Sequence, residues 1–245
     1  MNINFNILSM PKSIKRREFM KFKLSKVSIS NYTFFDAIDG HDLQEEYDTY
    51  IEHCHNKNQT ILNGDIGAYG CLMSHKKFFQ NIDNSQPQIL LEDDVYFHKH
   101  FNKLFPKVNN IIDEYDLIYL GYNNYHLSPE QKMAINFDDF FIPVSKNKLF
   151  TTCGTFAILY NVKAIQYFND LFTNLRNKHI QPVDVIIWLH ASRHLKSIIL
   201  NPPLCIAELR GSEIRSGYRD MKSFYNKRFI DINEYSNIDK YKNFM

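Results

Sequence analysis

The segment 89–97, ILLEDDVYF, runs from a buried-strand pattern straight into three consecutive acids. At an effective dielectric constant of 20, two carboxylates about 4 Å apart repel each other by about 4 kcal/mol. Glu92, Asp93 and Asp94 must therefore splay into water, take up protons or share a cation. In an open α/β sheet, ligands bind in the space beyond the carboxyl ends of the strands. The segment favours such a sheet, with a charged ligand at one edge.

The simplest alternative is that Asp93 and Asp94 are turn or helix-capping residues that point into water. Their direct emergence from the apolar run 89–91 favours the ligand instead. Carboxylate oxygens favour Mg²⁺ or Mn²⁺, which usually combine one or two protein carboxylates with substrate phosphates and water. The chain has neither G-x-x-x-x-G-K-[ST] nor G-x-G-x-x-G, which argues against a nucleoside triphosphatase or a dinucleotide enzyme. A nucleoside diphosphate bridged by a metal fits best.

Composition sets limits on the class of protein. The 245 residues are 44% hydrophobic, which is enough for one substantial core, and the net charge of +2 gives no strong attraction to nucleic acid. The four cysteines form neither a C-x-x-C pair nor a zinc spacing, so we expect reduced thiols. No run approaches the roughly 20 apolar residues of a membrane span, and the amino-terminal order of apolar and basic residues is the reverse of a signal peptide. We expect a cytoplasmic protein without a transmembrane segment, soluble or peripheral at the cytoplasmic face of a membrane.

Short apolar runs alternate with helical patterns, which predicts an α/β fold. Helices are expected from an Asp65 cap to about Ile82, and from Pro182 as a first helical position. Beyond about Gly211 the periodicity fades, so we expect a main domain over 1–215 and a carboxyl-terminal tail, 216–245, that packs on it. Strands are predicted over 6–10, 32–38, 88–91, 117–120, 156–160 and 197–200.

Five motifs in chain order together resemble glycosyltransferase family 25, over roughly residues 3 to 215. They are SMPKSIKRR (9–17), FFDAIDG (34–40), GDIGAYGCLMSH (64–75), ILLEDDV (89–95) and PVD (182–184). The family includes lipooligosaccharide galactosyltransferases and collagen galactosyltransferase domains. The resemblance implies a GT-A-like nucleotide-diphospho-sugar transferase fold, with a mixed central sheet flanked by helices. It also implies a UDP-sugar donor, most often UDP-galactose, dependence on Mn²⁺ (or Mg²⁺), and inverting transfer to a glycan acceptor such as lipooligosaccharide.

By position, the resemblance makes Asp93 and Asp94 the metal ligands and leaves a neighbouring acid, Glu92, to bind the donor's ribose. Ser9 and Arg16 fall where the first strand ends and the first helix opens, a place that attracts a diphosphate. The basic residues there, Lys12, Lys15, Arg16 and Arg17, could equally form a solvated helix face.

Asp39 and His75 are also predicted to contact the donor, each with a structural alternative. Asp39 could only satisfy its own turn, and His75 could only be packed in the core. Two departures from the family are Ser9-Met10, where Asn-Leu is frequent, and TFAI at 155–158, where the family often has T-x-A-Y. The second leaves the transferred sugar open.

Asp184 is our choice for the base that takes the acceptor hydroxyl's proton, because the resemblance places it there and inverting transfer needs such a carboxylate. An acid in the first turn of a helix is stabilised whatever its function. Glu208 and Glu213 are the substitutes. Two other functions remain as alternatives: a metal-dependent phosphoesterase, which needs more metal ligands, and a non-catalytic domain that binds a nucleotide sugar or a glycan.

Overall fold

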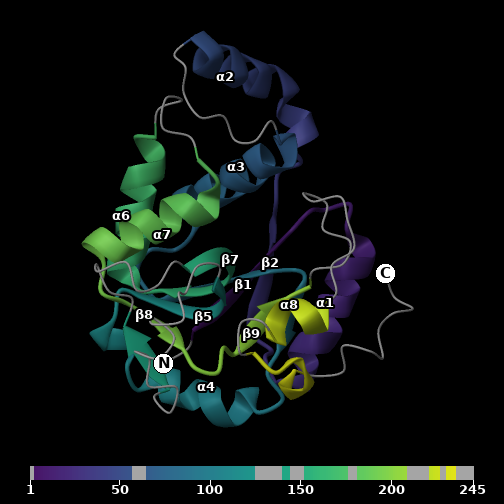
Figure 1. The fold of residues 1–245 in the computed structure, drawn as a ribbon, viewed down its shortest axis with the longest axis vertical. Coiled ribbons are helices and arrows are strands. Elements are labelled where there is room, and N and C mark those ends of the chain that lie inside the picture. The colour runs from purple at the N-terminus through teal and green to yellow at the C-terminus, as the bar shows by residue number, and fades with distance from the viewer. Residues whose placement is uncertain are drawn as a thin grey trace.

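The protein, seen in a computed structural model, is built around one seven-stranded mixed sheet with helices on both faces (Figure 1). The strand order is β2-β1-β3-β7-β5-β8-β6, and β4 and β9 form a separate antiparallel pair. The structure describes residues 3–56, 65–124, 140–143, 152–175, 181–208, 221–226 and 230–235. The strands are β1 (Asn4–Ser9), β2 (Tyr32–Asp36), β3 (Gln88–Glu92), β4 (Val95–Phe97), β5 (Leu117–Asn124), β6 (Phe141–Pro143), β7 (Thr152–Tyr160), β8 (Ser197–Leu200) and β9 (Cys205–Ala207).

The helices divide between the two faces of the sheet. α3, α6 and α7 share one hydrophobic cluster with the sheet, and α1 and α4 share another. The α-helices are α1 (Ile14–Lys26), α2 (Gln44–Asn56), α3 (Ile66–Asn81), α4 (Phe101–Asn109), α6 (Val162–Thr173), α7 (Val183–His194) and α8 (Met221–Asn226). Single 3₁₀ turns are η1 (Gly40–Leu43), η2 (Ile112–Glu114) and η4 (Ile232–Glu234).

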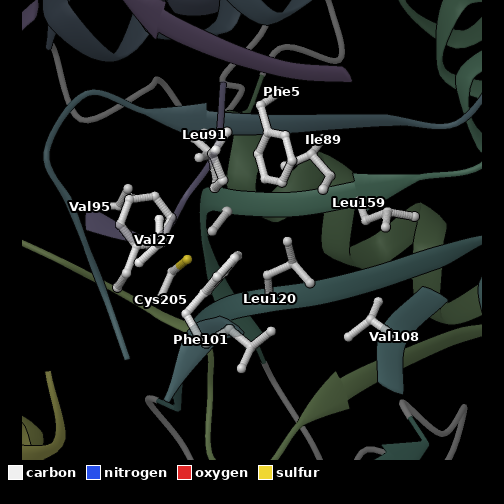
Figure 2. Close-up of a cluster of buried hydrophobic side chains, with 14 of the residues drawn as sticks. Phe5, Val27, Ile89, Leu91, Val95, Phe101, Val108, Leu120, Leu159 and Cys205 are labelled. Atoms are coloured by element: carbon white, nitrogen blue, oxygen red, sulfur yellow. The ribbon is translucent and has the colours of Figure 1, made fainter. Parts of the chain in front are cut away.

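The run 88–91 is a central strand that is buried on both faces. Ile89 and Leu91 point into the cluster beneath α1 and α4, which Figure 2 shows, whereas Leu90 points into the cluster beneath α3 and α6. Successive side chains of a strand alternate between the faces of a sheet, so both faces require an apolar residue here. The strand is therefore held rigidly up to the residue at which the acids begin.

All six predicted strands are present, with ends that differ by a few residues, and the predicted mixed α/β class is confirmed. β4, β6 and β9 were missed because three-residue strands carry too little pattern. Asp65 caps α3 as predicted, and its Oδ1 accepts the N–H groups of Gly67 and Ala68 at 2.9 and 3.3 Å. Pro182 was expected inside α7, but it precedes the helix because its ψ of 137° is extended.

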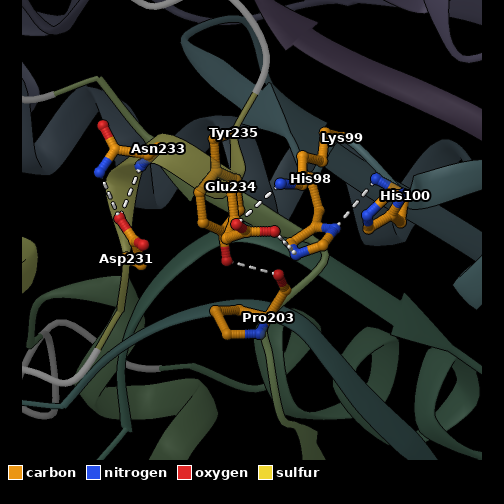
Figure 3. Close-up of polar contacts among 8 residues, drawn as sticks. All are labelled: His98, Lys99, His100, Pro203, Asp231, Asn233, Glu234 and Tyr235. Atoms are coloured by element: carbon orange, nitrogen blue, oxygen red, sulfur yellow. Dashed lines mark hydrogen bonds and ion pairs between the residues drawn. The ribbon is translucent and has the colours of Figure 1, made fainter.

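The carboxyl-terminal segment is fastened to the β4–β9 pair. Tyr96 and Ile206 share a hydrophobic cluster with α8 and with Tyr235. Figure 3 shows Tyr235 Oη donating to the carbonyl of Pro203 at 2.6 Å, and Lys99 Nζ pairing with Glu234 at 2.8 Å. The described parts of 216–245 thus pack on the strand that follows the acids. The domain boundary at residue 215 stays a prediction.

No helix in the described residues is long and apolar enough to cross a membrane.

Candidate functional site

A cleft of about 510 Å³ opens at the carboxyl ends of three neighbouring strands, β1, β2 and β3. These strands are mutually parallel, so the residues that follow them meet at one edge of the sheet. Six of the eight predicted site residues line this cleft: Ser9, Arg16, Asp39, Glu92, Asp93 and Asp94. His75 and Asp184, the other two, do not line it.

Asp93 is held by the side chains of two residues from the amino-terminal part of the chain. Ser9 Oγ donates to its Oδ2 at 2.6 Å, and Arg16 Nη1 donates to its Oδ1 at 2.9 Å. Ser9 ends β1 and Arg16 lies in the first turn of α1, so the register of β1 beside β3 brings the three together. Asp93 is buried, and this pairing compensates its charge.

Asp94 is partly buried, and its carboxylate lacks a full set of hydrogen-bond partners. Its Oδ1 has no hydrogen-bond partner among the described residues, although its backbone carbonyl accepts the N–H of Glu208 at 2.9 Å. Burial raises the pKa of Asp94 to about 6, while Arg16 opposes that rise and Asp93 adds to it. A buried, unpaired carboxylate oxygen is costly, which makes this atom the part of the site most in need of a cation.

A buried lysine lies behind the acids. Lys23 Nζ donates to the carbonyl of Val95 at 2.6 Å and lies 4.6 and 4.8 Å from the ring centroids of Phe19 and Tyr96. Burial lowers the pKa of Lys23 to about 8, and the nearby Asp94 works against that lowering. Glu208 is beside this group, where its Oε2 accepts the hydroxyl of Tyr96 at 2.7 Å.

Glu92 ends β3 and is partly buried. Its Oε1 accepts the Thr155 hydroxyl at 3.1 Å. Burial raises the pKa of Glu92 to about 8, and the charges of Asp94 and Asp184 contribute to the rise. Asp184 lies in the first turn of α7 and outside the cleft lining, and its charge acts on Glu92.

The loop after β2 forms the opposite wall and packs directly on α3. A Cβ added to Gly40 would lie 2.0 Å from the carbonyl oxygen of Ile66, so only glycine permits this approach. Ser74 Oγ accepts the N–H of Ile38 at 2.8 Å.

Asp39 caps η1 through the N–H of His41 and also pairs with Lys12. The turn role expected for Asp39 is thus present, and its carboxylate faces the cleft as well.

Of the four basic residues that follow the first strand, only some line the cleft. Lys12 and Arg16 line the cleft, whereas Lys15 is exposed outside it. Arg17 Nη2 donates to Asp36 Oδ1 at 2.6 Å and to the carbonyl of Ser9 at 2.7 Å, so it fastens α1 to the ends of β1 and β2. Two of these four basic residues, Lys12 and Arg16, therefore line the cleft.

His75 is fully buried in α3, with its Nδ1 3.1 Å from the carbonyl oxygen of Cys71. Burial lowers its pKa to about 4, so the ring is neutral at pH 7. Cys71 and Ser74 from the same helix line the cleft in its place. A donor contact by His75 stays a prediction, and its packing role is evident.

A profile of "Glycosyltransferase family 25 (LPS biosynthesis protein)" matches residues 2–187, which is well over half of the chain. This range includes every residue that lines the cleft. The chain belongs to glycosyltransferase family 25. The predicted family is confirmed at this level, without a sugar specificity. As expected, this family 25 protein has a mixed central sheet flanked by helices.

Individual proteins similar to this family 25 chain include "Putative glycosyltransferase R655" of Acanthamoeba polyphaga mimivirus, 27% identical over 69% of this chain and 53% of that protein. The chain thus spans about half the length of this relative. A solved glycosyltransferase involved in glycosylation of the major capsid of the virus PBCV-1 is 13% identical, with TM-score 0.40 over 86% of this chain and 95% of that one. The galactosyltransferase LgtC, solved with donor and acceptor sugar analogs, is 10% identical, with TM-score 0.41 over 99% and 100%.

The metal expected in this family 25 site fits the residues only in part. Within the described segments, no group of three His, Cys, Asp or Glu side chains is placed to hold an ion. Both Asp93 oxygens already accept hydrogen bonds from Ser9 and Arg16, which leaves the unpartnered Oδ1 of Asp94. Because Mg²⁺ usually keeps waters and takes most of its other ligands from substrate phosphates, one such carboxylate is a sufficient start.

Three residues that were not predicted as donor or metal contacts take part in this site. Thr155 reaches Glu92 from β7, and Lys23 and Glu208 lie behind Asp94. Glu208 had been considered only as a substitute base. One signal could have revealed Lys23, since it falls between the core residues Met20 and Leu24 on the buried side of α1.

Proposed function

We propose that the protein is a metal-dependent, inverting glycosyltransferase. It moves a hexose, galactose from UDP-galactose in the first instance, to a hydroxyl group of a glycan acceptor such as lipooligosaccharide. The observation that carries this proposal is the cleft itself, in which Lys12 and Arg16 face the carboxylates of residues 92–94 at the carboxyl ends of parallel strands. A diphosphate needs cations on one side and tolerates acids on the other only through a bridging metal.

The donor's diphosphate would lie between Lys12, Arg16 and Asp94. Asp94 would hold Mn²⁺ or Mg²⁺ through its unpartnered Oδ1, and such an ion stabilises the charge that develops on the departing UDP. Ser9 and Arg16 keep Asp93 in one orientation, so the wall beside the phosphates is rigid. Asp39 and Glu92 flank this position and are the candidates for contacts with the ribose and the sugar.

Asp184 is proposed as the base. The acceptor oxygen attacks the anomeric carbon and forms the new glycosidic bond, while the bond from that carbon to the UDP oxygen breaks on the opposite face. The acceptor's proton passes to the Asp184 carboxylate, and UDP leaves with the electron pair. The position of Asp184 in the first turn of α7, from which its charge acts on Glu92, is consistent with this role.

The first experiment measures UDP release from a panel of UDP-sugars, with Mn²⁺ or with EDTA, and with and without glycan acceptors. We expect UDP-galactose to be used, Mn²⁺ to be required, and Asp94→Asn and Asp184→Asn to lose at least a hundredfold in rate. Asp113→Asn, an exposed acid far from the cleft, is the control and should match the wild type. Release of inorganic phosphate would indicate a phosphoesterase, and donor binding without turnover would indicate a binding domain.

The acceptor is tested separately by transfer of labelled sugar to a glycan array that includes lipooligosaccharide cores. We propose a lipid-linked acceptor at the cytoplasmic face of a membrane. Transfer to soluble glycans alone, with none to lipid-linked ones, would contradict this part of the proposal and leave the donor chemistry intact.

A further inference from the structure

A second cavity, of about 350 Å³, lies at the opposite end of β1 from the donor cleft. Ile3 and Phe5 at the start of the strand line it, whereas Leu8 and Ser9 at the strand's end line the donor cleft. The six residues of β1 span about 17 Å, and the two cavities share no lining residue. The second cavity is therefore separate from the site described above.

The floor of this cavity is apolar and aromatic. Phe5, Val27, Ile29 and Phe101 are buried in the cluster of Figure 2, where Phe5, Val27 and Phe101 are labelled. The half-buried ring of Phe105 lies 5.7 Å from that of Phe5 and 5.1 Å from that of Phe101, measured between centroids. A ligand entering the cavity meets a hydrophobic surface that is already packed from below.

The mouth has a different character. None of the residues that line the cavity is charged. Those that are exposed come from two sides: the loop after α1 gives Ser28, Ser30 and Asn31, and α4 gives Asn102, Pro106 and Asn109. The mouth thus consists of hydroxyl and amide groups above an apolar floor.

The residues on the α4 side form a single face of that helix. Asn102, Phe105, Pro106 and Asn109 follow one another at i, i+3, i+4 and i+7, the spacing of neighbours on a helix surface. Within the part of the chain that the structure describes, neither Asn102 nor Asn109 uses its side-chain amide in a hydrogen bond. Both amides remain available to a ligand.

Pro106 leaves one carbonyl of α4 without its usual donor four residues later. Proline has no N–H, so Pro106 cannot donate to the carbonyl of Asn102 four residues earlier, as the other residues of a helix would. That carbonyl belongs to a residue of the cavity lining. Donors and acceptors are therefore both present beside the aromatic floor.

We propose that this cavity binds a neutral saccharide. A sugar ring presents C–H faces that pack on aromatic and apolar side chains and an edge of hydroxyl groups that pair with amides and hydroxyls, which is the arrangement of floor and mouth here. An anionic ligand would find no cation among the lining residues, and an acyl chain would have to pass a mouth of Ser and Asn. Saccharide binding at this place requires no transfer chemistry, so it stands apart from the proposed function.

The experiment is saturation-transfer NMR on the full chain with lactose, maltose and N-acetyllactosamine as probes. The double variant Asn102→Ala/Asn109→Ala removes both amides, and Asn109→Trp fills the cavity. Asn110→Ala, an exposed asparagine one residue outside the lining, is the matched control. We expect at least one probe to bind the wild type and the control, and its affinity to fall at least tenfold in both cavity variants.

Near-ultraviolet circular dichroism checks that the variants are folded, and the double variant carries the test if Asn109→Trp is not. UDP release should be unchanged in the double variant, which separates this cavity from the donor cleft. The proposal is overturned if no probe binds the wild type, if binding is equal in the double variant and the control, or if dodecanoate binds at this cavity and none of the saccharides does.

Discussion

Arg16 reaches across from α1 to donate to Asp93 at 2.9 Å, while its own side chain keeps 28% of its surface exposed and that of Asp93 keeps 7%. The pair therefore has one member at the cleft surface and one inside the protein. A charge that is buried with its partner removed is strongly destabilising. The arginine is thus expected to act on the stability of the site as well as on the ligand in front of it.

Arg16→Met should lower the free energy of unfolding by about 3 kcal/mol, because it leaves the Asp93 carboxylate buried and unpaired. Urea unfolding at pH 7 measures the change. Lys15→Met removes a neighbouring, exposed charge from the same helix and should change stability by no more than about 0.5 kcal/mol. Equal effects from the two variants would mean that the Arg16–Asp93 pair is absent in solution.

Asp93 and Asp94 should respond differently to the same amide substitution. Asp94→Asn removes a buried, unpaired carboxylate oxygen and should leave stability equal or higher at pH 8. Asp93→Asn puts an amide group where Ser9 and Arg16 both donate, and should destabilise the fold by about 1–3 kcal/mol. Thermal and urea unfolding of both variants, without donor or metal, compare them. The reverse order of stabilities would contradict the assignment of partners to the two acids.

Glu92 should give the protein a recognisable pH dependence of stability. Its pKa is raised from 4.5 to about 8 in the fold, so the protonated form contributes stability that is complete below about pH 4.5 and is lost as the pH rises through about 8. Glu92→Gln cannot ionise and should be more stable than the wild type at pH 8.5, by on the order of a few kcal/mol. At pH 4.5 the two proteins should differ little.

Urea midpoints at these two pH values measure the difference between Glu92→Gln and the wild type. The exposed Glu114→Gln is the control and should follow the wild type at both. If the midpoints of Glu92→Gln and the wild type change in parallel, Glu92 is not a buried acid with a raised pKa.

Gly70→Ala should displace the loop after β2, which forms one wall of the cleft. Its Cβ would lie 2.5 Å from the backbone nitrogen of Gly40 and 2.8 Å from the Cα atom, so the loop that carries Asp39 must move. Overpacking of this kind destabilises by about 1–3 kcal/mol, and we expect weaker UDP binding by calorimetry as well. Gln80→Ala, exposed on the same helix, should change neither quantity. Unchanged UDP affinity in a folded Gly70→Ala protein would place the nucleotide elsewhere.

Much of the candidate site follows from local sequence. Residues 89–91 are apolar at every position because the strand is buried on both faces, and that pattern also locates Glu92, Asp93 and Asp94 at the strand's carboxyl end. Ser9 was placed at the end of the first strand through the family resemblance, and Asp39 was placed just beyond the second. Most of the predicted residues that line the cleft lie at or just beyond the carboxyl ends of strands, because parallel strands end at the same edge of the sheet.

The partners of those residues could not be derived in this way. Nothing near Asp93 in the sequence indicates that Arg16 compensates it and that Asp94 is left unpaired. Lys23 comes from α1, where its Nζ donates to the carbonyl of Val95. Glu208 follows β9, and the register of β4 with β9 brings it beside Asp94. His75, a residue of a family motif, is fully buried, which the sequence left open as an alternative to a donor contact.

The amino-acid sequence by itself determined the alternation of strands and helices, the position of the acids at a strand end, and the family. These properties depend on neighbouring residues, because hydrophobic periodicity acts over a few positions along the chain. The tertiary structure alone decided which carboxylate is neutralised, which is left without a partner, and where a second cavity lies. Charge compensation and cavities depend on side chains that are far apart in the chain, and only packing brings them within a few ångströms.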